Sequence, residues 1–396
     1  MLKHRTLESF WGDRKGGLAI IAAIAAPVLL MLAGGAVDVQ RAEAARVQLQ
    51  DALDAAVLSG AGADSDGDTT AAESAFAANN PIAGVTPAFE LASGVLTGEA
   101  DASVATSFLK IIGVDAIPIA ADAIAIIGST PCVLLLEPAA ARALETGAGS
   151  TLDARSCPIQ VNSTAAGAAY ANNGSVIRTE SLCVKGTAVD SNATISPQAV
   201  TGCAPVNDPF ASTPEPVITT ACQDRSASGA GAVVRLPAGG CWRNVTSSSG
   251  GTIIFEPGVH RITGLVKADS RGTVQGLGTT LFFTGDGALE GASRSTITLS
   301  APTAGPTAGM ALWQSRTGNP NSSFLMNADV TGEIEGVVYI PRSTLALNSD
   351  VTATASYTLV IANKMLLSSR STLVVNANYA NGPPLPRALR PIRLES

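Results

Sequence analysis

The chain has 396 residues, of which 46% are hydrophobic, 4% aromatic and 14% charged. This apolar content is enough for a sizeable core, and the scarcity of aromatic residues means that small and β-branched side chains build it. The net charge of −7 excludes nucleic acid as a partner, because phosphate binding requires a basic surface.

An uncharged stretch of 22 residues, 16–37, lies near the start of the chain. At about 1.5 Å per residue, a helix of this length crosses a hydrocarbon core of roughly 30 Å. The stretch is longer than the apolar part of a secretory signal, and no small-residue cleavage site follows it. Apolar residues then recur at helical spacing: Ala42, Ala45, Leu49, Leu53 and Ala56. We therefore predict one helix over 16–62, a transmembrane part that continues as an amphipathic part.

Basic residues are unevenly distributed around this span. Lys3, Arg5, Arg14 and Lys15 precede it, whereas only Arg41 and Arg46 follow it closely. Positively charged flanks stay in the cytoplasm. We therefore predict a single-pass signal anchor, with residues 1–15 as a cytoplasmic tail and the body of the chain outside the membrane.

All six cysteines lie in the exported part: Cys132, Cys157, Cys183, Cys203, Cys222 and Cys241. An even number of cysteines in an oxidising compartment predicts three disulfides. Six cysteines allow 15 pairings, of which sequential pairing is favoured because it closes loops of similar, modest size. A metal site is disfavoured, because no CxxC pair is present and His260 is the only exported histidine.

The exported part is repetitive, with a period of about 20 to 30 residues. Residues 132–156 align with 157–181 without a gap, and a second set of motifs follows. These motifs are GTIIF at 251, GTVQG at 272, STITL at 295, SSFLM at 322, STLAL at 343 and STLVV at 371. Strand-rich repeats of this length, separated by Gly, Ser and Asn turns, are typical of a solenoid. We predict a right-handed parallel β-helix over 131–380, rather than a β-sandwich with its shorter strand spacing.

One apolar residue from each repeat is expected to point into a shared core: Leu134, Ile159, Ile253, Val274, Ile297, Leu345 and Leu373. Residues 63–130 are predicted to form a small α+β domain, with a Thr70–Glu73 capping box on its helix and a hairpin after it. The Pro-rich residues 206–216 are predicted as a turn segment, and residues 381–396 as an extended Pro/Arg tail. The chain is thus predicted to be mainly β.

Three patterns with catalytic or metal-binding potential are better explained as structural. The DSDGD sequence at 64–68 has calcium-like spacing, but Thr69 and Ala75 stand where a calcium loop needs glycine and glutamate. His260 follows a turn-like EPGV sequence and is predicted to be a surface or turn residue. Four aspartates share no common position in the repeat, so no catalytic carboxylate pair is expected: Asp269, Asp286, Asp329 and Asp350. We therefore predict no catalytic, metal or cofactor residues, and no enzyme.

Four arginines directly precede a repeat motif: Arg271, Arg294, Arg342 and Arg370. In a solenoid they would lie near one edge, and such a column of guanidinium groups could bind acidic polysaccharide or an acidic partner. The alternative is that arginine only solubilises a recurring turn. Trp242 and Trp313 are candidate sugar-stacking platforms, with a core or rim position as the equal alternative.

Residues 14–61 closely resemble the N-terminal segment of TadG-type Tad/Flp pilus-assembly proteins. The resemblance rests on an Arg-Lys-Gly-Gly entry, an Ala-rich span with Pro27, an Ala-Val-Asp-Val exit at 36–39 and the sequence LQDALDAA at 49–56. Residues 107–127 and the Cys-containing repeats are also similar to parts of that family. The Asp-x-Ser-x-Ser metal motif of some members is absent, and no glutamate stands five residues after Gly16 or Gly17, as prepilin cleavage requires.

The resemblance implies a protein of the bacterial inner membrane, with its body in the periplasm and adherence as its biological output. Expected partners are the lipid bilayer and pilus-assembly or other envelope proteins. The leading hypothesis is a non-enzymatic, membrane-anchored component of Tad/Flp pilus assembly or surface adherence. The alternative is an envelope polysaccharide-binding or polysaccharide-active β-helix protein.

Overall fold

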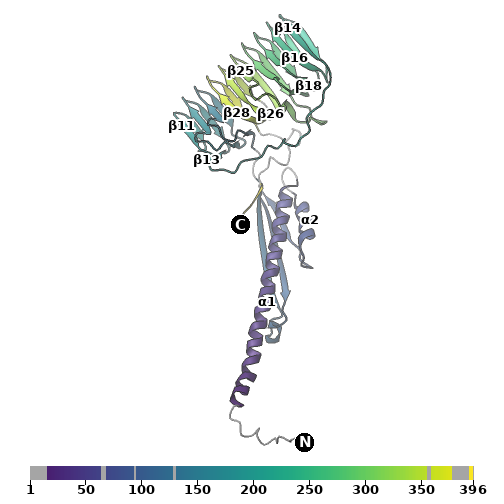
Figure 1. Cartoon of the computed structure of the whole chain (residues 1–396), viewed down its shortest axis with the longest axis vertical. Helices are drawn as coiled ribbons and strands as arrows, with labels where there is room; N and C mark the ends of the chain where they lie inside the picture. The colour runs from purple at the N-terminus through teal and green to yellow at the C-terminus, as the bar shows by residue number, and fades with distance from the viewer. Residues whose placement is uncertain are drawn as a thin grey trace, which may run out of the picture. The chain divides into compact units, whose positions relative to one another are not determined.

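The computed structural model describes residues 16–63, 68–92, 95–127, 131–354, 358–376 and 392–395. The chain folds into two compact units, one formed by Met1–Gly128 with Ile392–Ser396 and the other by Ser129–Pro391 (Figure 1). The predicted cytoplasmic tail, residues 1–15, lies outside the described residues, as do residues 64–67 of the DSDGD sequence.

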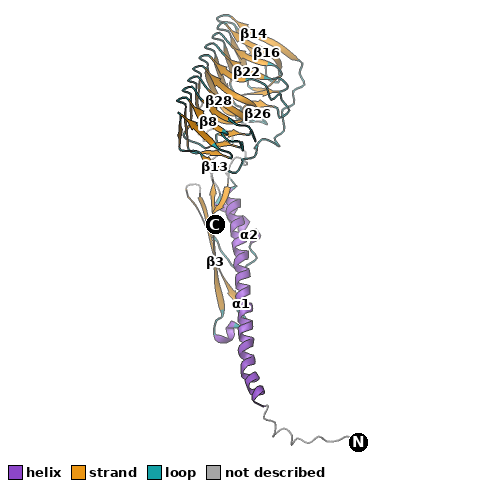
Figure 2. Cartoon of the chain, turned by 60° about the vertical axis from the view of Figure 1, so that its left-hand side comes forward, coloured by secondary structure: helices purple, strands orange, loops and turns teal. Residues whose placement is uncertain are grey.

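The first unit contains α1 (Gly16–Ala61), α2 (Thr69–Asn79), the short 3₁₀ helix η2 (Leu109–Ile112) and one antiparallel sheet. The sheet has the order β1 (Ala88–Ala92), β2 (Val95–Ala105), β3 (Ala116–Ile127) and β30 (Ile392–Glu395). The predicted single helix over 16–62 is confirmed, and Figure 2 shows it alongside β3.

The two parts of α1 have different surroundings. In its later part, Leu49, Leu53 and Val57 are fully buried in a cluster with Phe76 of α2 and Leu96 of β2. In its earlier part, large apolar side chains are exposed on every side of the helix, including Ile20, Ile24, Leu30 and Leu32 at 63–69%. The packed part explains the amphipathic pattern, and the exposed part matches the uncharged span.

Two local predictions for this unit need correction. The N-cap of α2 is Asp68, whose side chain accepts a hydrogen bond from the Thr70 N–H at 2.8 Å, so Thr70 lies inside the helix and not at its cap. The C-terminal segment predicted as an extended tail includes a strand, β30, which pairs antiparallel with Ile124–Ile127 of β3. Pairing between segments so distant in sequence leaves no local signal.

The second unit is a parallel β-solenoid of about 11 turns, as predicted, and Figure 2 shows its strands stacked coil upon coil. Each coil contributes strands to three faces. In stacking order, the first face contains β14 (Cys222–Ser228), β16 (Cys241–Ser248), β18 (Gly258–Ile262), β21 (Thr279–Phe283), β24 (Met310–Gln314), β26 (Thr331–Asn348), β28 (Thr358–Leu367), β4 (Val133–Leu135), β7 (Ile159–Val161), β10 (Leu182–Val184) and β13 (Val200–Thr201).

The long strands β14, β16, β26 and β28 continue onto the second face, and β26 begins on the third. The second face also contains β19 (Leu265–Ala268), β22 (Ala288–Gly291), β25 (Phe324–Asn327), β5 (Leu144–Thr146), β8 (Ala169–Asn172) and β11 (Ala188–Ser191). The third face contains β15 (Val233–Leu236), β17 (Thr252–Phe255), β20 (Thr273–Gly276), β23 (Thr296–Ser300), β27 (Thr352–Thr354), β29 (Thr372–Val374), β6 (Thr151–Ala154), β9 (Val176–Thr179) and β12 (Thr194–Ser196).

The spatial order of the coils differs from their order in the chain. The first coil, with β4, is inserted between the last coil, with β28, and the coil that contains β7. The chain therefore enters the stack in its interior, builds coils outward to β13, crosses to the opposite end at β14 and returns coil by coil to β28. Figure 1 shows β13 and β14 at opposite ends of the stack.

Six of the seven residues predicted to share one core do so: Ile159, Ile253, Val274, Ile297, Leu345 and Leu373. Leu134 does not, because Val133 and Leu135 point inward and Leu134 packs in a separate cluster on the outer side of the first face. The predicted single ladder also combines two faces. SSFLM and STLAL lie on the second face, as part of β25 and β26, whereas the other four motifs lie on the third.

Candidate functional site

The six cysteines form three disulfides in the sequential pattern, Cys132–Cys157, Cys183–Cys203 and Cys222–Cys241, and none of them is free. Each bridge joins two adjacent coils, the second at the β13 end of the stack and the third at the β14 end. A terminal coil has a neighbour on one side only, so it lacks half of its stacking contacts. A covalent bridge offsets that loss.

Residues 204–221 connect β13 to β14 and cross the outer side of the first face; we refer to them as the strap. The first face has eleven strands, so the strap covers about 48 Å at about 4.8 Å per step. Eighteen residues reach at most about 60 Å when extended, so the strap has little length to spare beyond the crossing. The turn predicted in its Pro-rich sequence is present at residues 208–213, where the Ala211 and Thr213 N–H groups donate to the carbonyl oxygens of Asp208 and Phe210 at 3.3 and 3.0 Å, and the residues around this turn make the crossing.

Hydrogen bonds attach the strap to the coils along its course. The Asn162 amide bonds both the Val206 N–H and the Val206 carbonyl, at 3.0 and 2.7 Å. Further along, the Tyr339 hydroxyl donates to Asp208 at 2.7 Å. The Arg316 guanidinium donates to the carbonyl oxygens of Phe210 and Thr213 at 2.9 and 2.8 Å. These contacts attach the strap to the coils, although none of its residues belongs to a strand.

An apolar cluster lies between the strap and the first face. Its members are Leu134, Phe210, Phe282, Met310, Trp313, Val337, Tyr339, Leu359 and Ile361. Edge-to-face ring contacts run from Phe210 to Tyr339 at 5.3 Å, from Tyr339 to Trp313 at 6.4 Å and from Trp313 to Phe282 at 5.9 Å. Because Trp313 is fully buried, it is a packing residue and not a platform for a sugar ring.

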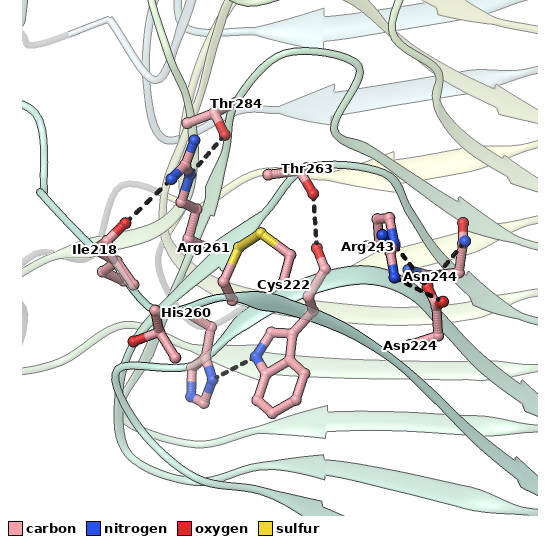
Figure 3. Close-up of a disulfide and its surroundings, with 12 residues drawn as sticks. Ile218, Cys222, Asp224, Arg243, Asn244, His260, Arg261, Thr263 and Thr284 are labelled. Atoms are coloured by element: carbon pink, nitrogen blue, oxygen red, sulfur yellow. Dashed lines mark hydrogen bonds and ion pairs between the residues drawn. A yellow bond between two sulfur atoms is a disulfide. The ribbon is translucent and has the colours of Figure 1, made fainter.

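A groove of about 580 Å³ opens between strap residues Glu215–Ile218 and the outer sides of β18 and β21, together with the residues that directly follow β18, β21 and β24. Its polar side chains bond to one another and to the strap (Figure 3). Arg261 donates to the Thr284 hydroxyl and to the Ile218 carbonyl, both at 3.1 Å. Glu215 accepts from the Ser315 hydroxyl at 2.8 Å and is the only carboxylate among the groove's lining residues. The groove can offer hydrogen bonds, but it does not contain the two carboxylates that glycosidic cleavage requires.

His260 and Trp242, the residue after Cys241, form a buried pair, and Figure 3 shows His260 near the disulfide of Cys222. The Trp242 indole N–H donates to His260 Nδ1 at 3.2 Å, and His260 Nε2 lies 2.8 Å from the Glu256 carbonyl oxygen. These partners require the neutral tautomer with its proton on Nε2, and burial lowers the pKa of His260. The predicted surface position of His260 is therefore wrong, and Trp242, 4% exposed, is likewise a core residue.

This pair makes stability depend on pH. As the pH falls below the ordinary histidine pKa of about 6.5, His260 is protonated in the unfolded chain but stays neutral in the folded chain. The free energy of unfolding therefore falls. Between pH 7.5 and 5.5, urea unfolding of the wild type should lose about 1 kcal/mol more than that of His260→Gln. Carboxylates titrate in both proteins and cancel. Equal losses would show that His260 is not held neutral.

Three of the four predicted arginines occupy one column of turns. Arg271, Arg294 and Arg370 have φ of 60–65° in the turn that precedes the third face. Their N–H groups donate to the carbonyl oxygen in the equivalent turn of the next coil, at 2.8–3.0 Å. Arg342 lies elsewhere, at the junction of the first and second faces, where its Nε donates to the Gly318 carbonyl at 2.8 Å.

The turn column also contains acidic residues. Asp329 and Asp350 have the same positive φ and the same hydrogen bonding, so, contrary to prediction, two of the four aspartates share a repeat position. Arg370 forms a two-point ion pair with Asp350, with both contacts at 2.8 Å, and this hydrogen bonding lowers the pKa of Asp350. Among the described residues, only Arg271 and Arg294 of the column thus keep exposed guanidinium groups without a bonded partner.

The other two aspartates have local structural roles. Asp269 forms an ion pair with Lys267 at 3.2 Å, and Asp286 accepts a hydrogen bond from the Asn319 amide at 2.8 Å. Across the described part of the chain, no three His, Cys, Asp or Glu side chains come together as a set of metal ligands.

The protein combines a helix that has a long exposed apolar part with a β-solenoid. In the chain sequence, the solenoid is inserted between β3 and β30, two strands of the small sheet. Helix α1 is long and apolar enough to cross a membrane. Residues 16–63 match the Tad family model, described as Flp pilus-assembly TadE/G-like. The chain therefore carries a TadE/G-like domain over α1, in agreement with the resemblance seen in the sequence. Neither the curated proteins nor the solved structures contain a match to the chain.

Proposed function

We propose that this protein is a non-enzymatic, membrane-anchored component of Tad/Flp pilus assembly or surface adherence, with its β-solenoid outside the cytoplasm. The observation that carries the proposal is the Tad match on α1, a helix whose matched segment includes the exposed apolar part. Apolar side chains exposed at 63–69% on all sides of a helix are unfavourable in water and favourable in hydrocarbon.

The non-enzymatic part of the proposal rests on the chemistry of the candidate sites. Acid–base catalysis needs a titratable group within reach of a substrate atom. Histidine 260 is buried and bonded at both nitrogens, and Glu215, the carboxylate of the groove, is bonded to Ser315 and Arg316. The strap, the disulfides and the turn column are structural features that stabilise the solenoid, and their described contacts suggest no catalytic role.

Two measurements test the proposal together. Detergent-solubilised membranes should yield pilus-assembly subunits with the wild-type chain, but not with a chimera that carries an unrelated apolar span in place of residues 16–37. In addition, a membrane-impermeant maleimide should label Val217→Cys, whose side chain is 87% exposed in the wild type, once the outer membrane is opened. Ser9→Cys should react only after detergent is added. The reverse labelling pattern would overturn the orientation, and an absence of co-purifying subunits would overturn the pilus assignment.

An acidic polysaccharide is the second candidate ligand, and the adjacent unpaired arginines Arg271 and Arg294 are the observation in its favour. Reversing both to glutamate should lower the affinity for polygalacturonate at least several-fold, because two exposed cations become anions. The matched control reverses Arg178 and Arg235, which are exposed on strands β9 and β15 away from the column. Equal loss in both double variants would mean that only net charge matters.

A further inference from the structure

The connection between β2 and β3 has an apolar surface where a polar turn is expected. We call residues 106–115 the hairpin tip. Phe108, Ile111, Ile112 and Val114 of this segment are exposed at 41%, 66%, 64% and 40%. Turns between antiparallel strands are normally rich in polar residues, and a cluster of exposed large apolar side chains indicates an interaction site.

The hairpin tip is fixed to α1 by a specific set of contacts. The Asp38 carboxylate accepts hydrogen bonds from the N–H groups of Ser107, Phe108 and Leu109, at 3.0, 2.7 and 2.8 Å. A Cβ atom on Gly34 would lie 2.3 Å from the Phe108 ring, so only glycine allows the ring to pack this closely. These contacts place the tip at one defined level of the helix.

That level is the end of the apolar span. Gly34 is 18 residues beyond the start of α1 at Gly16, a rise of about 27 Å at about 1.5 Å per residue. The hydrocarbon core of a bilayer is about 30 Å thick, so the tip meets α1 where the helix leaves the hydrocarbon. The most exposed apolar side chains of the helix extend to Leu32, which is 67% exposed, and Val37 and Val39, at 41% and 49%, are exposed at the level of the tip.

We propose that the hairpin tip inserts into the outer interface of the bilayer beside α1, as a second membrane contact of the same unit. This inference rests on the membrane anchoring proposed above. Aromatic and aliphatic side chains favour the interface, and Lys110 can extend its ammonium group towards the lipid phosphates. Asp38 also lowers one cost of insertion, because it satisfies three N–H groups that a poorly hydrated environment would leave unpaired.

The test uses the full chain in phosphatidylcholine–phosphatidylglycerol vesicles. Ile111→Cys carries an environment-sensitive NBD label, and the six native cysteines do not react because they are bridged. The matched control is Ala120→Cys, an exposed position on β3 of the same hairpin, opposite Asp101 and away from the tip. Lipids with a nitroxide near the headgroup should quench the label at position 111 several-fold more than at position 120, and its emission should be blue-shifted.

The possible failures are distinct. If the vesicles float without the protein, the membrane anchoring fails and this proposal falls with it. If the protein floats but both labels emit as in water, the anchoring stands and the insertion of the tip is overturned. A blue-shifted label at position 111 that nitroxide lipids do not quench would show that a protein surface, from a second copy or a partner, covers the tip instead of lipid.

Discussion

Replacing Ile297 with aspartate should unfold the coils on either side of β23. The Ile297 side chain is fully buried in the main core, and its strand pairs with β20 on one side and β26 on the other. A carboxylate placed there has no cation or donor within the apolar core, and leaving it unpaired costs several kcal/mol. The loss should be visible as a lower melting temperature in circular dichroism and as faster hydrogen exchange in β20, β23 and β26.

The matched control for this substitution is Thr298→Asp, one residue further along the same strand. Thr298 points outward and is half-buried, so an aspartate at this position stays hydrated and should change the melting temperature little. If Ile297→Asp and Thr298→Asp melted alike, the assignment of the inward and outward sides of the third face would be wrong.

Reduction of the three disulfides should destabilise the solenoid from its ends. The bridges close loops of 25, 20 and 19 residues, each of which corresponds to about 3 kcal/mol of stabilisation in the chain-entropy model. Dithiothreitol should therefore lower the melting temperature markedly. Limited proteolysis of the reduced protein should cut first near β13 and β14, where a coil has a neighbour on one side only.

Serine replacements separate the bridges from one another. Losing Cys183–Cys203 or Cys222–Cys241 should expose the adjacent terminal coil to protease. Losing Cys132–Cys157 should expose less, because its coils have neighbours on both sides. An unchanged melting temperature after complete reduction would show that coil stacking alone stabilises the ends.

Local periodicity was sufficient to predict the long helix and the parallel solenoid, and the even number of exported cysteines was sufficient to predict three disulfides. Periodicity could not predict the order of the coils, because every coil offers similar strands to its neighbours and nothing local distinguishes β28 as the partner of β4. The inward residues were predictable where apolar and polar residues alternate. They were not predictable around Leu134, because the strap covers the outer side of β4 and makes the strand apolar on both sides.

The candidate site was harder to predict, because the residue types around a position do not reveal on which face of the solenoid it lies. Arg342 and Arg370 both precede the sequence Ser-Thr-Leu, but the motif after Arg342 belongs to the second face and not the third. Conversely, Asp329 and Asp350 share a turn with Arg271 although their flanking letters differ. For His260, the neighbouring proline and glycine suggested a turn, whereas its burial depends on Trp242, one coil away.

Entry and exit by adjacent interior coils leave both ends of the stack without a covalent connection to the first unit. During evolution, coils could thus be duplicated or deleted at either end without changing the two chain connections to the first unit. Only the length of the strap must follow the number of coils, by about one and a half extended residues for each coil gained or lost. Homologues of different length are therefore expected to vary together in coil number and in the length of this one segment.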